Sequence, residues 1–372
     1  MTGFCAGSSI PNCSASYTTI QPDPDIGGIG VLISFLLSAA ITLFVSILGI
    51  AIFHLPKRLD EASSITLSTP AAVVSTTPQA TKSIRKLFRQ RVQVSDDIRE
   101  YWLTVIERFL LGMADQQLVT GTACLVVGFI KCDITVYHFT IVTDLAWFSS
   151  STHLSAMRIL NRYLREYTAA RFWRVIVMLV MYSLLMTSSV LESNDSWYAS
   201  LPSPARCLFK ATSGNVTLPS NAFWLAFNIG ITTWAYATTI IPLFPSVCLP
   251  IRNGWNVFLK QAKSLMKSTN SRTKRHVKHR SKVVRVIRAL TNGDLLDIYF
   301  EVFWFAFSLW SIITDRAYGE PYMSSSDVGA QSSWGFGQLV PVFLISLPIL
   351  TALEIFYGMS ISAVYSNTHF SC

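Results

Sequence analysis

The chain is short of charge. Asp, Glu, Lys and Arg make up only 14% of its 372 residues, whereas hydrophobic residues make up 51%. A soluble domain normally carries about 25% charged residues. The deficit argues against a soluble domain and predicts an all-α, polytopic membrane protein.

Sequence signatures of common catalytic sites are also missing. The chain has no His-Glu-X-X-His zinc motif, no Gly-X-Ser-X-Gly nucleophile turn and no Walker phosphate loop. We therefore assign no catalytic residue, no cofactor and no metal site, and we favour a protein without enzymatic activity.

The beginning of the chain lacks the features of a cleaved signal peptide. Residues 1–27 contain no Lys or Arg and no early apolar core, both of which such a peptide needs. We expect these residues to form an extracellular segment, and the apolar run after them to remain as a membrane anchor.

Long apolar runs, in contrast, are abundant. A helix needs about 20 apolar residues to cross the hydrocarbon core of a bilayer. The first candidate span is 28–53, and six more make up the rest of the bundle over 114–361. These six are 114–130, 134–157, 172–191, 222–247, 296–314 and 337–361.

A polar break at Lys131-Cys132-Asp133 separates the second span from the third. Cytoplasmic loops collect Lys and Arg, which allows the break to be tested. With seven spans and the N-terminus outside, the inner segments hold 26 basic residues and the outer segments 4. Merging 114–157 into one span gives 12 inside and 17 outside. We therefore predict seven transmembrane helices, with a cytoplasmic tail at 362–372.

Three glycosylation sequons agree with this orientation. Asn12, Asn194 and Asn215 each begin an Asn-X-Ser/Thr triplet, and all three fall on the predicted outer side. We expect a multi-pass glycoprotein of the plasma membrane, with an internal membrane as the alternative.

Two long inner loops have unusual compositions. In the first, 54–113, the middle part 61–83 is rich in Ser, Thr, Ala and Pro, which predicts disorder. The part that follows, 84–112, alternates apolar and charged residues at helical spacing. We expect it to form an amphipathic helix on the inner leaflet that leads into the second span.

The second of these inner loops, 250–295, is strongly basic. Within it, 252–293 has 12 Lys or Arg and no acidic residue. We expect it to contact anionic lipids of the inner leaflet, where each basic residue gains about 1 kcal/mol. Docking of a cytoplasmic protein partner is the alternative. Nucleic acid is not expected, because the loop is tethered at the membrane and has few aromatic residues.

Four of the seven cysteines lie on the predicted outer side: Cys5, Cys13, Cys132 and Cys207. Disulfides form in the oxidising compartments through which such segments pass. Four cysteines allow three pairings. The simplest is Cys5 with Cys13 and Cys132 with Cys207.

Titratable residues interrupt the third span. His138 and His153 lie about 60° apart around a helix, and Asp144 points 120–180° away from them. One helix therefore cannot bring the three together as a metal site. Because both histidines lie near the ends of the span, we expect water to reach them.

Asp144 needs a partner inside the bundle, because a charge in lipid is costly. We expect interhelical hydrogen bonds with hydroxyl or amide groups such as that of Asn228. Glu301 in the sixth span and Glu354 in the seventh also need a partner inside the bundle. A ligand counter-ion or a proton relay is the alternative role for each acid.

The architecture resembles that of G-protein-coupled receptors. The resemblance rests on seven spans, on the outer N-terminus and on Asn161-Arg162-Tyr163, which stands where these receptors carry an acidic-Arg-Tyr motif. The segments 22–39 and 115–166 are similar to recurrent segments of uncharacterised multispanning proteins of filamentous fungi. That second likeness implies a fungal membrane protein and brings no activity with it.

Three functions fit these features. We favour the first, a receptor-like protein or sensor, because of the topology, the basic inner loop and the prolines in the fifth and seventh spans. The second, an alternative, is a secondary transporter or exporter, which the acids within the spans support. The third is a membrane protein of a fungal secondary-metabolite gene cluster, such as a cyclase that resembles the small seven-span terpene cyclases.

Overall fold

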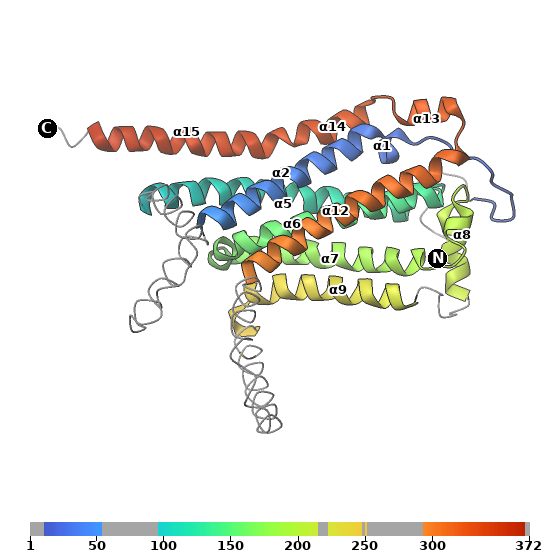
Figure 1. Ribbon diagram of the computed structural model, residues 1–372, viewed down its shortest axis with the longest axis horizontal. Coiled ribbons are helices and arrows are strands. Elements are labelled where there is room, and N and C mark those ends of the chain that lie inside the picture. Colours follow the sequence, from blue (N-terminus) through green and yellow to red (C-terminus); the bar gives the residue numbers. More distant parts are fainter. Residues whose placement is uncertain (1–10, 54–95, 215–221, 248–249, 251–292, 369–372) are drawn as a thin grey trace, which may run out of the picture.

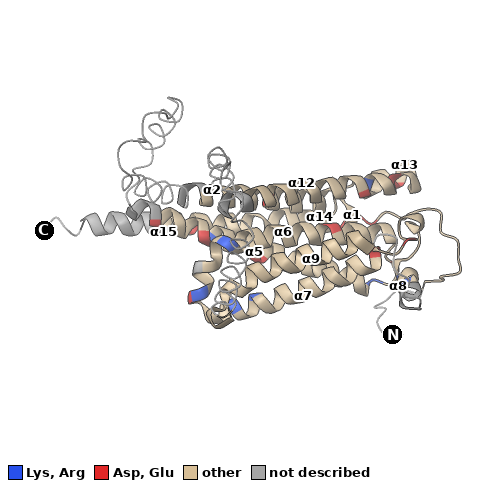
Figure 2. Ribbon diagram, turned by 60° about the horizontal axis from the view of Figure 1, so that its bottom comes forward, with Lys and Arg blue, Asp and Glu red and all other residues tan. Residues whose placement is uncertain are grey.

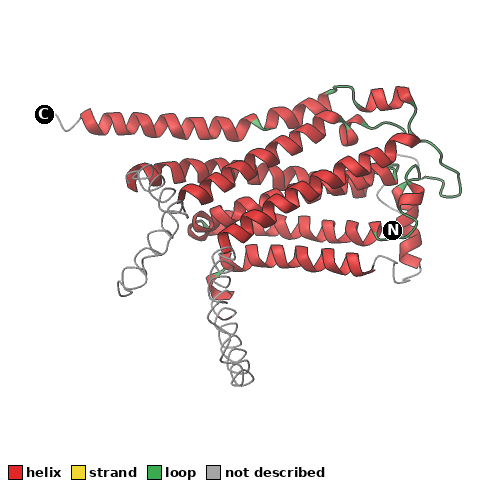
Figure 3. Ribbon diagram, viewed as in Figure 1, coloured by secondary structure: helices red, strands yellow, loops and turns green. Residues whose placement is uncertain are grey.

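A computed structural model describes residues 11–53, 96–214, 222–247, 250 and 293–368 (Figure 1). The described residues form helices joined by loops, without a β-strand (Figure 3). The long helices are α2 (Ile29–Phe53), α5 (Asp96–Ile130), α6 (Val136–Glu166), α7 (Thr168–Glu192), α9 (Ala222–Ile240), α12 (Gly293–Gly319) and α15 (Ser346–Thr368). The shorter ones are α1 (Pro24–Gly27), α8 (Ala205–Gly214), α13 (Ser325–Gln331) and α14 (Phe336–Leu344).

Within the described part, five stretches are long and apolar enough to cross a membrane. They are Pro24–Ile50, Glu100–Ile130, Thr168–Glu192, Ile298–Tyr322 and Ser325–Tyr357. They coincide with the predicted first, second, fourth, sixth and seventh spans. The helices α6 and α9, in the third and fifth positions, are not among the five. The all-helical architecture with apolar spanning helices is confirmed, while the number seven and the orientation remain predictions.

The predicted break between the second and third spans is present. Helix α5 ends at Ile130 and α6 begins at Val136. Helix α5 also begins early, at Asp96, so the later part of the predicted amphipathic segment is continuous with the second span. There Val105 and Leu110 are buried. The remainder of that segment, the range 61–83 and almost all of the basic loop lie outside the described residues.

Helix α6 is the centre of the bundle. It packs against α2, α5, α7, α9 and α12, and Figure 1 shows it in the middle of these helices. Its polar side chains are buried with its apolar ones. The hydroxyls of Thr140, Thr143 and Thr152 donate to backbone carbonyls one turn earlier in the same helix. Such internal bonds satisfy hydroxyl groups where water is absent.

The outer end of α6 is covered by the loop that follows α7. The first N–H groups of a helix have no partner within it. Here the N–H of Val136 donates to the Ser203 carbonyl at 2.9 Å, and that of Tyr137 to the Leu201 carbonyl at 3.2 Å. Trp197 lies fully buried beneath this loop, and its indole N–H donates to Thr140 Oγ1 at 2.9 Å.

A disulfide connects α8, which follows this loop, to the N-terminal segment. Cys13 is bonded to Cys207, with Cα atoms 5.5 Å apart. The predicted pairs Cys5–Cys13 and Cys132–Cys207 are therefore wrong, although Cys13 and Cys207 are both bonded as expected. Cys132 is also disulfide-bonded, whereas Cys5 lies outside the described residues. The simplest pairing failed because it joined neighbours along the chain, and the fold instead brings residue 13 onto α8.

Charge is unevenly distributed along the bundle. Figure 2 shows most Lys and Arg residues of the described part gathered at the end away from α8 and α13. Asn12 and Asn194, two of the predicted glycosylation sites, belong to segments at the α8 end. Asn215 lies outside the described residues, and glycosylation at all three stays a prediction.

Replacing Cys13 with Ser should destabilise the protein markedly. The bond closes a sequence separation of 194 residues, and loss of a native disulfide typically costs about 2–5 kcal/mol. We expect a lower melting temperature in detergent for Cys13→Ser and an equal loss for Cys207→Ser. The double variant should lose no more than either single one, and Cys124→Ala, at a free cysteine, should change little. Melting of Cys13→Ser at the wild-type temperature would contradict the assignment.

Gly121 lies where α5 packs closely against α6. A Cβ added there would lie 2.5 Å from Ser149 Oγ and 2.8 Å from Met181 Cε, so Gly121→Ala should cost about 1–3 kcal/mol of stability. Gly230 on α9 has nothing within 4 Å of the same position. Gly230→Ala should be neutral or slightly stabilising, because Ala is the better helix former. Equal melting temperatures for the two variants would show that the helices do not meet at Gly121.

Candidate functional site

Asp144 has its partners on α12. The Ser311 hydroxyl donates to Asp144 Oδ1 at 3.0 Å and also lies 3.3 Å from Asp315 Oδ2. The sequence predicted a hydroxyl or amide partner for Asp144, and Ser311 fills that role in place of Asn228. The nearby second carboxyl, Asp315, is 8% exposed.

The two carboxyl groups also lie close enough to interact with each other. A hydrogen bond between two carboxyl groups needs a proton on one of them, because an ionised carboxylate can only accept. Asp144 Oδ2 is buried and receives no hydrogen bond from an N–H or hydroxyl of the described residues. Two like charges in contact do not readily ionise together, so a pair of this kind is suited to hold one proton between its carboxyl groups.

Further polar groups surround this acid pair, Asp144 and Asp315. Glu192, the last residue of α7, lies close enough to interact with both, and its carboxyl contacts the Thr143 hydroxyl. The Tyr198 phenol lies close enough to Asp315 to interact with it. Partial burial and the charges of the neighbouring acids raise the pKa of Tyr198, so this phenol keeps its proton.

The acid pair is not neutralised by a cation. In the described part of the chain, salt bridges join Lys131 to Asp23, Arg158 to Glu301 and Arg174 to Asp115, and none of these three includes the acid pair or Glu192. Nor do the described residues contain a group of three His, Cys, Asp or Glu side chains that could hold a metal ion. A bound proton is thus the simplest compensation for the charge.

A groove lies toward the other end of the same helices. Its floor is α6, and its walls are α9 and α12, with Leu43 of α2 at one side. The groove is partly open to its surroundings, and its lining is more apolar than polar. Glu301 is buried in it, 8% exposed, with Oε1 3.6 Å from Arg158 Nε.

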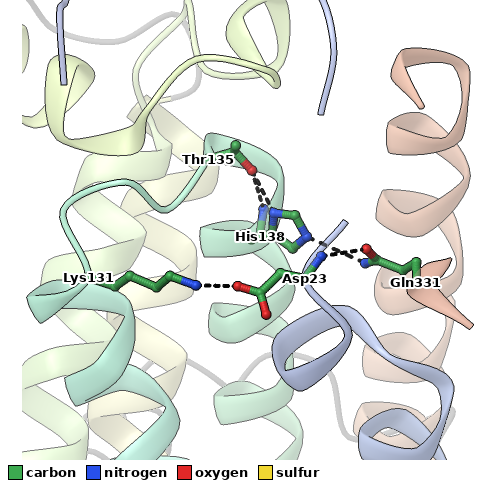
Figure 4. A network of polar contacts seen from close by, with 5 residues as sticks. All are labelled: Asp23, Lys131, Thr135, His138 and Gln331. Carbon is green, nitrogen blue, oxygen red and sulfur yellow. Dashed lines mark hydrogen bonds and ion pairs between the residues drawn. The ribbon is translucent and has the colours of Figure 1, made fainter. Parts of the chain in front are cut away.

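A third polar cluster joins three segments at the outer end (Figure 4). His138 contacts Thr135 Oγ1 at 2.8 Å and the Gln331 side chain at 3.5 Å. The backbone N–H of Asp23 donates to Gln331 Oε1 at 2.9 Å, and the Asp23 carboxylate pairs with Lys131. The cluster fastens the segment before α1 and helix α13 to the start of α6.

The two histidines are not open to water, contrary to prediction. His138 is 3% exposed, and His153 is fully buried with Nδ1 3.0 Å from the Ala114 carbonyl. Neighbouring helices cover both ends of α6, which the sequence of one span could not reveal. Each histidine has a structural partner, and neither lies in the acid pair or the groove.

The predicted acids are distributed over separate places. Asp144 lies in the acid pair and Glu301 in the groove, whereas Glu354 is exposed on α15 and, contrary to prediction, is not buried. The sequence analysis missed Asp315 and Glu192, because the predicted spans ended at 314 and 191, one residue before each acid. The spacing of Ser311 and Asp315, four residues apart on one helix face, was the available signal.

Comparisons with known proteins give one informative similarity. No family model and no solved structure matches the chain. The chain is similar to the "Elsinochromes biosynthesis cluster protein HP3" of Elsinoe fawcettii, with 31% identity over 137 residues. This alignment covers 37% of the chain and 46% of that protein, so the chain spans less than half the length of its relative. The similarity and the apolar helices fit the expected fungal membrane protein.

The shared proton should be visible by infrared spectroscopy. A protonated carboxyl absorbs at the C=O stretching frequency of a carboxylic acid, distinct from that of a carboxylate. We expect this band in the purified protein at neutral pH and its loss or marked weakening in both Asp144→Asn and Asp315→Asn. Asp133→Asn, at an exposed position in the α5–α6 turn, serves as the control. A band that survives unchanged in both pair variants would show that the pair holds no proton.

Proposed function

We propose that this chain is a seven-span membrane protein of a fungal secondary-metabolite cluster, and that it exports a small molecule by proton-coupled secondary transport. The observation that carries the proposal is the acid pair, two buried carboxyl groups that lie together between α6 and α12 and share the Ser311 hydroxyl as a neighbour. Ionisable groups buried at membrane depth are costly and commonly mark ion pathways or proton relays.

The lengths of α6 and α9 support seven crossings. Helix α6 has 31 residues, or about 46 Å at 1.5 Å per residue. Helix α9 has 19 residues, or about 28 Å, close to the thickness of the hydrocarbon core. The low hydropathy of α6 is no obstacle to crossing, because other helices separate it from lipid. The gathering of basic residues at one end (Figure 2) supports a cytoplasmic location for that end.

The acid pair and the groove are connected by the same two helices. Along α6, Asp144 precedes Arg158 by fourteen residues, and along α12, Glu301 precedes Asp315 by fourteen. Two bonds thus join the helices about 21 Å apart, the acid pair toward the outer end and the ion pair in the groove. Loss of the shared proton leaves two negative charges in contact, which favours separation of the helices at the outer end.

The transporter accounts for more of these features than a receptor does. The relative's name describes a biosynthesis cluster protein, and it gives the receptor-like interpretation no support. The basic loop, on which docking of a cytoplasmic partner depended, lies outside the described residues. The acid pair, in contrast, offers a candidate proton site on α6 and α12, two of the helices that line the groove.

The proposal can be tested in the organism of origin. Deleting the gene should trap a secondary metabolite in the cells, and untargeted mass spectrometry of cells and medium should show at least about a tenfold fall in its medium-to-cell ratio, equivalent to about 1.4 kcal/mol. The wild-type gene and Asp133→Asn should restore the ratio. Asp144→Asn and Asp315→Asn should not restore it, because Asn cannot release a proton.

Protein abundance must be matched in the membrane fraction of every strain. The proposal fails if the ratio of every secreted compound is unaffected by the deletion. It also fails if Asp144→Asn, present at the wild-type amount, restores export fully.

A further inference from the structure

The groove has an aromatic lining on two of its sides. Trp147 on its α6 floor and Trp304 and Phe305 on its α12 wall are partly exposed, so their rings have surface left for a ligand. Aromatic rings prefer to pack against other flat rings in stacked or edge-to-face arrangements. The shape and chemistry of these side chains suit a planar aromatic molecule.

Most of the polar lining can accept hydrogen bonds. Five lining hydroxyls already donate their hydrogens to carbonyls of their own helices: Ser151, Thr152, Ser155, Thr232 and Thr239. A hydroxyl that donates still has lone pairs with which to accept. Glu301 adds a carboxylate, which can only accept, whereas Arg158 is the charged donor of the lining and is paired with Glu301. A ligand with O–H donors complements these acceptors.

The charge of the groove selects against ions. Arg158 and Glu301 are the charged residues of the lining, and they pair with each other. A charged ligand would have to compete with one member of this pair and leave the other exposed to apolar surroundings, which is costly. A neutral ligand meets no such penalty.

We infer that the groove binds a neutral, lipid-soluble aromatic molecule that carries hydroxyl groups. The hydroxyls of this ligand donate to the serine and threonine oxygens and to Glu301, while its rings lie against Trp147, Trp304 and Phe305. A lipid acyl chain is a poorer occupant, because it has no donor for these acceptors. That this ligand is also the transported molecule rests on the function proposed above, whereas its binding does not.

The inference is tested with two probes that differ in one donor. 1-Hydroxypyrene has a phenolic O–H, and 1-methoxypyrene has the same ring system without it. Binding to the protein in lipid nanodiscs is followed by energy transfer from tryptophan, with empty nanodiscs subtracted. We expect saturable binding of 1-hydroxypyrene, about tenfold tighter than that of the methyl ether, as one well-placed hydrogen bond provides.

Two variants locate the binding in the groove. Ala235→Phe, on the α9 wall, should weaken binding of 1-hydroxypyrene about tenfold or more by filling the space. Ala226→Phe, exposed elsewhere on the same helix, is the matched control and should bind as the wild type does. Glu301→Gln keeps the side-chain shape and should reduce the preference for the phenol. A melting temperature for each variant separates lost binding from lost folding.

Equal affinities for the two probes would overturn the inference, and so would wild-type binding by a folded Ala235→Phe variant. Should Ala235→Phe fail to fold, an unchanged preference for the phenol in Glu301→Gln would overturn it instead. Asp144→Asn lies outside the groove and should retain binding. If the protein binds 1-hydroxypyrene but deleting the gene leaves export unchanged, the proposed transport is rejected and the binding site stands. If export depends on the gene but the protein does not prefer the phenol, the assignment of the groove is rejected and the proposed transport stands.

Discussion

The structure depends on burying α6, a helix with many polar side chains, among helices that are more apolar. Helix α6 carries hydroxyls, two histidines and an aspartate, too many polar groups to face lipid unaccompanied. Its neighbours α2, α5, α7 and α12 present apolar faces outward and make room for it inward. The need to keep α6 away from lipid explains why α5 packs closely against it at Gly121. It also explains why a loop covers the first turn of α6.

Between α6 and α12 the same constraint creates two interactions of different kinds. The acid pair joins two groups of like charge, while Arg158 and Glu301 form an ion pair of opposite charges. The two contacts lie fourteen residues apart along each helix, and the helices run in opposite directions. In the proposed mechanism, loss of the shared proton acts on the acid pair alone and opens the bundle at one end only. The groove borders the end that stays fastened.

Much of the fold could be predicted from the sequence, because hydropathy and charge act locally. The apolar runs located the long helices, and Lys131-Cys132-Asp133 located the turn between α5 and α6. Single-helix geometry also separated Asp144 from His138 and His153. The burial of those histidines could not be predicted, since it depends on side chains from other helices.

The candidate site was harder to predict, because it joins residues that are distant in sequence. Asp315 and Glu192 fell just beyond predicted span ends, where an acid looks like part of a loop. The Cys13–Cys207 bond likewise depends on where the N-terminal segment folds back. The ends of a helix are the hardest part to locate from sequence. Because Asp315 and Glu192 lie at such ends, they were not predicted to be buried.

The central claim is that a proton shared by Asp144 and Asp315 holds α6 and α12 together at their outer ends. Spin labels at positions 133 and 317, both exposed, would report the distance between the α5–α6 turn and α12 by double electron–electron resonance. The account predicts that this distance grows as the pH is raised in the wild type, and that it stays short in Asp315→Asn, which cannot develop the second charge. A distance that does not change with pH in the folded wild type would contradict it.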